Sequence, residues 1–316
     1  MSFPAPFGHL APLTAAVVAA ISLMGCASSG GSVAPNPFKI ATSTGATQPH
    51  IGTLRVFGDS YSDITFTNSQ RTGNWVRELG ARIPTDVTLN YAIGGARAGY
   101  AGHREFNRQL DTMTLRGQDK VGNTDLTIVY LGHNDMGRNG SPDNNLTNAK
   151  KGYSDGVARL IAAGAAADNR RLFVTQLHDW GRGPGVSSLA SQQVIGWNNY
   201  IASVANATPN VIAVDMYTAF ERVFADPARF GFTNVTTADA SRSATDTLYH
   251  DATHFGNRGQ DIITRVYQHY LTRGWDWANS VSAGADAASR LNQDIDNEVL
   301  LFKHNSRNRP TSGFAV

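Results

Sequence analysis

Short apolar runs alternate with helix-like segments along most of this chain, and this alternation limits what it can fold into more than any other feature. The runs are rich in Val, Ile, Leu and Phe and are bounded by Gly, Asn or Asp, as is typical of strands buried on both faces. They cover residues 53–57, 125–131, 171–177 and 210–216. Apolar residues recur at helical spacing in residues 148–166, 189–205 and 258–270. Strands separated by helices need right-handed crossovers, so the sequence predicts an α/β fold whose parallel sheet is covered on both sides.

The composition excludes several classes of protein. Of the 316 residues, 41% are apolar, which is enough for a substantial core. The 27 Lys and Arg residues nearly balance the 25 Asp and Glu residues, giving a formal charge of +2. Binding to nucleic acid needs a clustered excess of positive charge, so no nucleic-acid partner is expected. The only cysteine, Cys26, excludes an internal disulfide and any metal site built from several cysteines.

The longest apolar run, residues 10–25, ends at that cysteine. About sixteen apolar residues are fewer than the roughly 20 that span a membrane, but they suit the apolar part of an export signal. The tetrapeptide LMGC at residues 23–26 resembles the bacterial lipobox, in which the chain is cut before a cysteine that receives lipid. We therefore expect residues 1–25 to be a lipoprotein-type export signal and Cys26 to be lipidated. The alternative is an ordinary cleavable signal with an incidental cysteine.

The remaining chain divides into three parts. Residues 26–50 begin with a Ser-, Gly- and Pro-rich stretch and are expected to form a flexible tether between membrane and domain. Residues 51–274 hold the alternating pattern and form the predicted domain. Residues 275–316 form a C-terminal extension with an apolar stripe at helical spacing, made of Leu291, Ile295, Val299 and Phe302. We expect this helix to pack on the domain, with docking to a membrane or a partner as the alternative.

Polar motifs follow two of the predicted strands, where the active sites of open α/β sheets lie. FGDSYSD, residues 57–63, comes directly after the first strand. Its glycine permits a sharp turn, and its first serine can begin a helix whose free N–H groups favour developing negative charge. LGHND, residues 131–135, follows the second strand, while NYAIGGA (90–96) and DATH (251–254) complete the set. Each motif alone is equally compatible with a turn or a helix cap, but four together favour a site.

In this order the four segments resemble the blocks of the GDSL (SGNH) esterase/lipase family, over roughly residues 52–273. The resemblance implies a flavodoxin-like three-layer α/β/α sandwich with a central parallel sheet, the SGNH hydrolase fold. FGDSYSD, NYAIGGA and the segment ADPARFGFTN (225–234) look closest to the branch that contains plant lipases, bacterial outer-membrane esterases and related acyltransferases.

The resemblance also implies a role for individual residues. Ser60 corresponds to the nucleophile, His254 to the base and Asp251 to the acid. The backbone N–H groups of Ser60 and Gly95 and the side chain of Asn134 correspond to the donors of the oxyanion hole. A serine hydroxyl needs an adjacent base, and preorganised donors stabilise the negative charge of a tetrahedral intermediate. The expected activity is hydrolysis of small-molecule or lipid carboxylic esters through an acyl-enzyme, with no metal or organic cofactor.

Three alternatives stay open at this point. The same residues also suit an acyltransferase that moves the acyl group to an alcohol, or the protein is a catalytically inactive ligand-binding lipoprotein. A third alternative is a zinc site, because His250 and His254 have the spacing of a zinc hydrolase motif if they lie on one helix. Against it, Asp replaces the usual Glu, Thr253 is a poor helix former, and the segment FGN at residues 255–257 ends the helical pattern.

Several polar and aromatic residues near these motifs are given supporting or neutral roles. We expect Asp63 to brace the nucleophile loop and Asp135 to be structural. Four further histidines are expected at the surface or in loops: His103, His133, His178 and His269. Three aromatic residues either line a pocket near the strand ends or belong to the core: Tyr61, Trp75 and Trp180. The branch usually continues its first block with Gly-Asn after the aspartate, whereas here Ile64 and Thr65 follow Asp63 and a Gly-Asn pair stands at residues 73–74, so this region is expected to be rearranged.

An exported lipoprotein of this kind is expected at the bacterial outer membrane, and without the lipid in the periplasm or outside the cell. The sequence makes no prediction of the oligomeric state.

Overall fold

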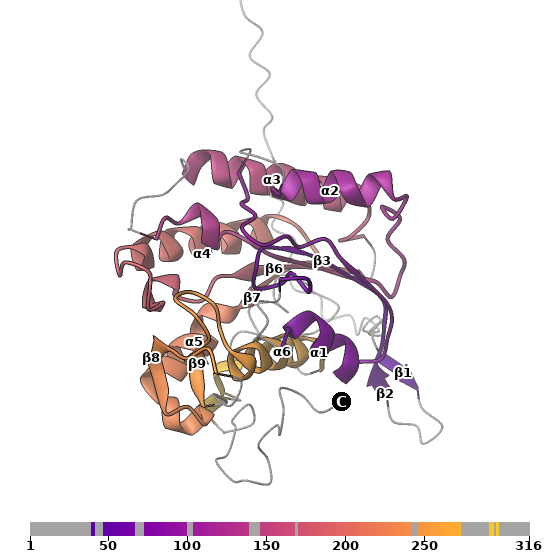
Figure 1. Cartoon of the computed structure of the whole chain (residues 1–316). Coiled ribbons are helices and arrows are strands. Elements are labelled where there is room, and N and C mark those ends of the chain that lie inside the picture. The colour runs from indigo at the N-terminus through magenta and orange to yellow at the C-terminus, as the bar shows by residue number, and fades with distance from the viewer. Residues whose placement is uncertain are drawn as a thin grey trace, which may run out of the picture. The chain divides into compact units, whose positions relative to one another are not determined.

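A parallel sheet of five strands, ordered β4-β3-β5-β6-β7, lies at the centre of the protein (Figure 1). Its strands are β3 (Ile51–Gly58), β4 (Thr85–Asn90), β5 (Leu126–Tyr130), β6 (Arg171–Gln176) and β7 (Val211–Asp215). Taken in chain order, this is the flavodoxin-like order 2-1-3-4-5, so the predicted fold class is confirmed. The strand order reverses beside β3, and ligands of such sheets bind outside the carboxyl ends of the strands at this point.

The computed structural model describes residues 39–41, 47–66, 73–99, 104–138, 146–167, 170–241, 246–272, 291–293 and 295–296. All of them belong to one compact unit, Val33–Val316. The predicted export signal, Cys26 and most of the tether and of the C-terminal extension lie outside the described residues. Within the described part of the chain, no helix is both long and apolar enough to cross a membrane.

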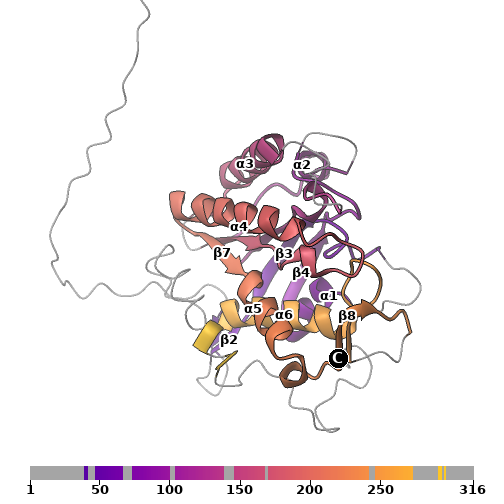
Figure 2. The same ribbon diagram turned by 90° about the vertical axis from the view of Figure 1, so that its left-hand side faces the viewer.

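Helices cover both faces of the sheet and complete three layers (Figures 1 and 2). One face carries α2 (Phe106–Leu115), α3 (Leu146–Ala162) and α4 (Ala190–Ala207). The other carries α1 (Trp75–Arg82), α5 (Met216–Ala225) and α6 (Asn257–Thr272). The described residues also form two short strand pairs: β1 (Lys39–Ala41) with β2 (Thr47–Pro49), and β8 (Asn234–Ala238) with β9 (Thr247–Tyr249). Three 3-10 turns are present as well: η1 (His133–Asp135), η2 (Trp180–Arg182) and η3 (Pro227–Phe230).

The four strands and three helices predicted within the domain are present, with ends that differ by at most four residues. β5 is buried along its whole length, as its unbroken apolar run predicts. The apolar face of α6, which includes Ile263, Val266 and Tyr270, is likewise buried. Burying one such large side chain is worth roughly 1.5–3 kcal/mol, so this packing fixes the strand ends from which the site loops emerge.

The described part of the C-terminal extension contacts the domain, as expected. Leu291 and Ile295 are buried in the hydrophobic core. Arg229 Nη2 donates to the carbonyl oxygen of Ile295 at 2.8 Å, and Arg222 pairs with Asp296 at 3.2 Å. The other two residues of the predicted stripe, Val299 and Phe302, lie outside the described residues.

Candidate active site

FGDSYSD forms a tight turn at the carboxyl end of β3. A Cβ added to Gly58 would lie 2.7 Å from the carbonyl oxygen of Tyr130, so only glycine fits at this strand end. The N–H groups of Ser62 and Asp63 both donate to the carbonyl oxygen of Asp59, at 3.0 and 2.9 Å. This closes a single turn, so Ser60 lies in a turn and does not begin a helix as the sequence suggested.

The three residues expected to react come together at this turn. Ser60 Oγ lies 2.7 Å from Nε2 of His254. The other ring nitrogen, Nδ1, lies 2.8 Å from Oδ2 and 2.9 Å from Oδ1 of Asp251. Because a carboxylate can only accept, Nδ1 donates to Asp251, so in the neutral form of the ring the lone pair of Nε2 faces the serine hydroxyl.

Asp251 is held as an anion by its own short loop. Its Oδ1 accepts from the backbone N–H groups of Thr253 and His254, at 2.9 and 2.7 Å. Burial alone would raise the pKa of Asp251, but the hydrogen bonds and charge of His254, together with these N–H groups, outweigh burial and hold the pKa well below its usual range. A carboxylate in this place keeps the imidazole oriented and stabilises an imidazolium.

The two remaining candidate residues lie on neighbouring loops. Gly95, in the turn after β4, has a φ of +79°, which favours glycine. Its N–H has no acceptor among the residues that the structure describes. Asn134 lies in η1 after β5, and its Nδ2 donates to the carbonyl oxygen of Ala96 at 2.9 Å. This bond joins the loops of Gly95 and Asn134 at the edge of the sheet where Ser60 lies.

The two nearby aspartates brace these loops, as expected. Asp63 Oδ1 accepts from the N–H of Thr65 and its Oδ2 from the N–H of Gly94, both at 2.8 Å. Asp135 Oδ2 accepts from the N–H of Ala98 at 2.8 Å. Both carboxylates thus accept from backbone N–H groups of the neighbouring loops.

The Gly-Asn pair at residues 73–74 is separated in sequence from FGDSYSD but contacts it in the structure. Asn74 Nδ2 donates to the carbonyl oxygen of Asp63 at 3.3 Å, across 11 residues of chain. The same side chain caps α1 by accepting from the N–H of Val76 at 2.9 Å. The displaced Gly-Asn pair therefore lies beside the aspartate that it directly follows in the family pattern.

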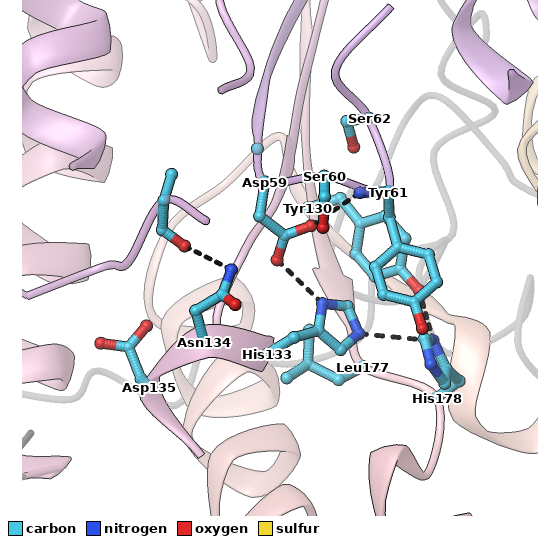
Figure 3. A network of polar contacts seen from close by, with 12 residues as sticks. Asp59, Ser60, Tyr61, Ser62, Tyr130, His133, Asn134, Asp135, Leu177 and His178 are labelled. Carbon is cyan, nitrogen blue, oxygen red and sulfur yellow. Dashed lines mark hydrogen bonds and ion pairs between the residues drawn. The ribbon is translucent and has the colours of Figure 1, made fainter. Parts of the chain in front are cut away.

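A chain of buried polar groups lies behind the nucleophile turn, and the sequence reasoning missed it (Figure 3). His133 Nδ1 lies 3.0 Å from Oδ2 of Asp59, and its Nε2 lies 3.3 Å from Nδ1 of His178. Tyr130 Oη lies 2.8 Å from the same nitrogen of His178. Burial, helped by the nearby His133 and His254, lowers the pKa of His178 well below its usual value, so its ring is neutral.

The prediction of surface or loop positions holds for His133 and His178, which lie in the loops after β5 and β6, and is wrong for His269, which lies in α6. His133, His178 and His269 are all buried, and His103 lies outside the described residues. A usable signal was present, because His133 and His178 each follow a predicted strand within two residues. That is the position where parallel sheets gather the groups of their sites.

The aromatic residues near the motifs belong to the core. Tyr61, Trp75 and Trp180 are all buried in the core, which is the second of the two expected roles. Tyr61 nevertheless supports the site, because its hydroxyl donates to the carbonyl oxygen of Thr253. The half-buried ring of Phe66, which the sequence analysis did not single out, lies 4.9 Å from the ring of His254.

The zinc alternative requires a helix that residues 250–254 do not form. They follow β9 as a series of bends, and Nε2 of His254 faces Ser60. Among the described residues, no group of three or more His, Cys, Asp or Glu side chains is placed to hold a metal ion.

The comparisons with known proteins concern most of the described unit. A model of the GDSL-like Lipase/Acylhydrolase family matches residues 56–262. No curated protein matches the chain. Similar solved structures include a lipolytic protein of the G-D-S-L family from Veillonella parvula (15% identity over 70% of this chain and 98% of that chain, TM-score 0.44). Others are an acetyl xylan esterase (14%, 68% and 98%, TM-score 0.47) and a lipase from a goat rumen metagenome (14%, 69% and 96%, TM-score 0.43).

The family model spans the nucleophile turn, the loops of Gly95 and Asn134, and the segment with Asp251 and His254. It also covers well over half of the chain, so this protein belongs to the GDSL-like lipase/acylhydrolase family of hydrolases.

Proposed function

We propose that the protein is a serine-dependent carboxylic ester hydrolase that works through an acyl-enzyme intermediate. The observation that carries this proposal is the hydrogen-bonded line from Asp251 through His254 to Ser60, with steps of 2.8 and 2.7 Å. A serine hydroxyl reacts with an ester when an adjacent base removes its proton.

In the first half of the reaction, Ser60 Oγ attacks the ester carbonyl carbon while His254 Nε2 takes its proton. The N–H groups of Ser60 and Gly95 and the amide of Asn134 stabilise the oxyanion. The imidazolium of His254 then protonates the leaving alcohol, and the acyl group remains on Ser60. In the second half, His254 takes a proton from water, which attacks the acyl carbon, and then returns that proton to Ser60 Oγ as the bond to the acyl group breaks and the acid leaves.

Replacement of the nucleophile tests this mechanism. We expect Ser60→Ala to lower kcat for p-nitrophenyl acetate by at least about 10³-fold, because the attacking oxygen is lost. A fluorophosphonate probe should label the wild type and not the variant. Ser203→Ala, which removes an exposed hydroxyl on α4, is the matched control and should change neither readout. Full activity in Ser60→Ala contradicts the proposal.

The substrate class follows from the same proposal. The sequences FGDSYSD and NYAIGGA support a place in the branch of plant lipases and outer-membrane esterases, whose members act on small-molecule and lipid esters. A panel of esters from acetyl to long acyl chains, with acetylated sugars, measures the preference. Adding an alcohol acceptor to the same assay measures how much acyl group is transferred and how much is hydrolysed.

We also propose that the protein is an exported lipoprotein anchored in the bacterial outer membrane through Cys26. The apolar run at residues 10–25 and the position of the only cysteine support this proposal. In a Gram-negative host, the wild type should incorporate a labelled fatty acid and sediment with outer membranes. Cys26→Ser should do neither while keeping esterase activity. An unlabelled, freely soluble wild type contradicts the anchor.

A further inference from the structure

The backbone of Gly94, next to a proposed oxyanion donor, is held on both sides by charged side chains. Its N–H donates to Oδ2 of Asp63 at 2.8 Å, and Arg104 Nη1 donates to its carbonyl oxygen at 3.0 Å. A Cβ added to Gly95 would lie 3.3 Å from the same guanidinium nitrogen. The guanidinium of Arg104 therefore lies directly beside the Gly94–Gly95 peptide.

The direction of the Gly95 N–H follows from this contact. The Gly94 carbonyl and the Gly95 N–H belong to one planar trans peptide, in which the two groups point in opposite directions. Arg104 fixes the carbonyl and so fixes the direction of the N–H, which has no acceptor among the described residues. A charge-assisted bond to a carbonyl also polarises the amide and makes its N–H a stronger donor.

Arg104 is itself tied to the strand that carries the nucleophile. The fully buried Gln109 donates from Nε2 to the carbonyl oxygens of Gly58 and Arg104, at 2.8 and 3.1 Å. The N–H of Gly58 donates back to Oε1 of Gln109 at 3.0 Å. The backbone of Arg104 is thus joined to the end of β3, while Arg104 as a whole is exposed, so its side chain can be removed without opening the core.

We propose that Arg104 is a positioning residue that orients and polarises the Gly94–Gly95 peptide toward the oxyanion. The inference rests on the proposed function, because it takes the Gly95 N–H as an oxyanion donor. Negative charge on the substrate oxygen develops only during the reaction, so a weakened donor slows kcat and leaves substrate binding almost unchanged.

The test compares Arg104→Ala and Arg104→Lys with Arg108→Ala, which removes an exposed arginine on α2 that pairs with Asp111. We expect Arg104→Ala to lower kcat about 10–100-fold with KM within about threefold, less than loss of a whole oxyanion donor. Arg104→Lys keeps a donor for the Gly94 carbonyl and should lose less. Added guanidinium ion, below denaturing concentration, should restore part of the kcat of Arg104→Ala. Arg108→Ala should match the wild type.

Three results overturn the inference: a kcat of Arg104→Ala within twofold of Arg108→Ala, a raised KM with unchanged kcat, or equal losses in Arg104→Ala and Arg104→Lys without rescue by guanidinium. The last decides the matter even if Arg104→Ala melts at a lower temperature, because a folding defect is not relieved by a small cation. Failure of the proposed function gives a separate signal, full activity in Ser60→Ala.

Discussion

Asp59, the residue before the proposed nucleophile, uses both carboxylate oxygens to shape the turn. Oδ1 accepts from the N–H of Tyr61 at 3.0 Å, and Oδ2 lies 3.0 Å from Nδ1 of His133. Asp59 is fully buried. A buried carboxylate is tolerated only with such partners, so the turn that presents Ser60 depends on a histidine that takes no part in the proposed reaction.

His133→Ala should therefore lower the free energy of unfolding by at least about 1–3 kcal/mol, because Asp59 is left buried with one oxygen unpaired. Urea denaturation followed by circular dichroism measures the loss. His50→Ala is the matched control, since His50 forms its 2.9 Å pair with the exposed Asp86. That surface pair should be worth no more than about 1 kcal/mol. Equal losses in the two variants would show that Asp59 does not need His133.

At the scale of single residues, the sequence indicated the candidate reacting residues but not the residues that hold them in place. Ser60, Asp251 and His254 lie in short motifs, so their proposed roles followed from a local pattern and a resemblance. The bond between Asp59 and His133 spans 74 residues, and no local pattern reports it. The contact of Arg104 with Gly94 escaped for another reason, because exposed arginines are common and carry no pattern of their own.

In the central sheet, the sequence predicted the four strands that are largely buried. β3, β5, β6 and β7 are largely covered on both faces and read as apolar runs. β4 is an edge strand with Val87 exposed at 46%, so its sequence TDVTLN shows no apolar run and was missed. Helix α5 was missed for another reason. It begins at Met216 directly after β7, with Asp215 as its N-cap, so the apolar pattern continues from the strand into the helix without a visible boundary.

The contact between α1 and α6 makes stability depend on pH. Thr264 Oγ1 of α6 donates to Oε2 of Glu78 of α1 at 2.8 Å, and burial raises the pKa of Glu78 to about 8. In the unfolded chain the same group titrates near 4.5. The folded protein therefore holds a proton that the unfolded chain releases, and stability falls as pH rises from about 4.5 to about 8.

Glu78→Gln should remove this fall, because the amide has no proton to lose. We expect the wild type to lose on the order of 1 kcal/mol for each pH unit between pH 5 and 8 relative to the variant. Chemical denaturation at both pH values measures the difference. Glu221→Gln, a half-exposed carboxylate on α5 that pairs with Arg182, is the control. Parallel pH dependence in wild type and Glu78→Gln contradicts the assignment.

For the molecule as a whole, the alternation of strands and helices in the sequence predicts the layers of the fold but not which strands lie next to each other in the sheet. It requires parallel strands and helices on both faces, because crossovers from strand to strand must pass over the sheet. It does not say which strands pair, so the flavodoxin-like order came from the family resemblance. The C-terminal extension adds to this core from outside the sheet, through Leu291 and Ile295.

Shortening a buried side chain of the C-terminal extension should lower the stability of the protein. Ile295 packs beside Phe230, Ile262 and Val266 around a small gap, so Ile295→Ala should cost about 2–4 kcal/mol of stability. Thermal and urea unfolding measure the loss, while kcat at 25 °C should stay at the wild-type value. Leu115→Ala, at a side chain 87% exposed, should change stability by less than about 0.5 kcal/mol. Similar results for the two variants contradict a structural role for the extension.

The acid and the base of the proposed site share one loop, and Asp251 accepts hydrogen bonds from that loop's own backbone. The contact between Asp251 and His254 is therefore formed within one short segment, and it is kept when that loop moves relative to the rest of the domain. Only the 2.7 Å gap between the Ser60 oxygen and the His254 nitrogen is left to tertiary structure. Tyr61, which follows Ser60 in the turn, donates a hydrogen bond from its hydroxyl to the carbonyl oxygen of Thr253 in this loop and so helps to hold the turn and the loop together. Loosening the fold thus disconnects the hydroxyl first, while the carboxylate and imidazole stay engaged.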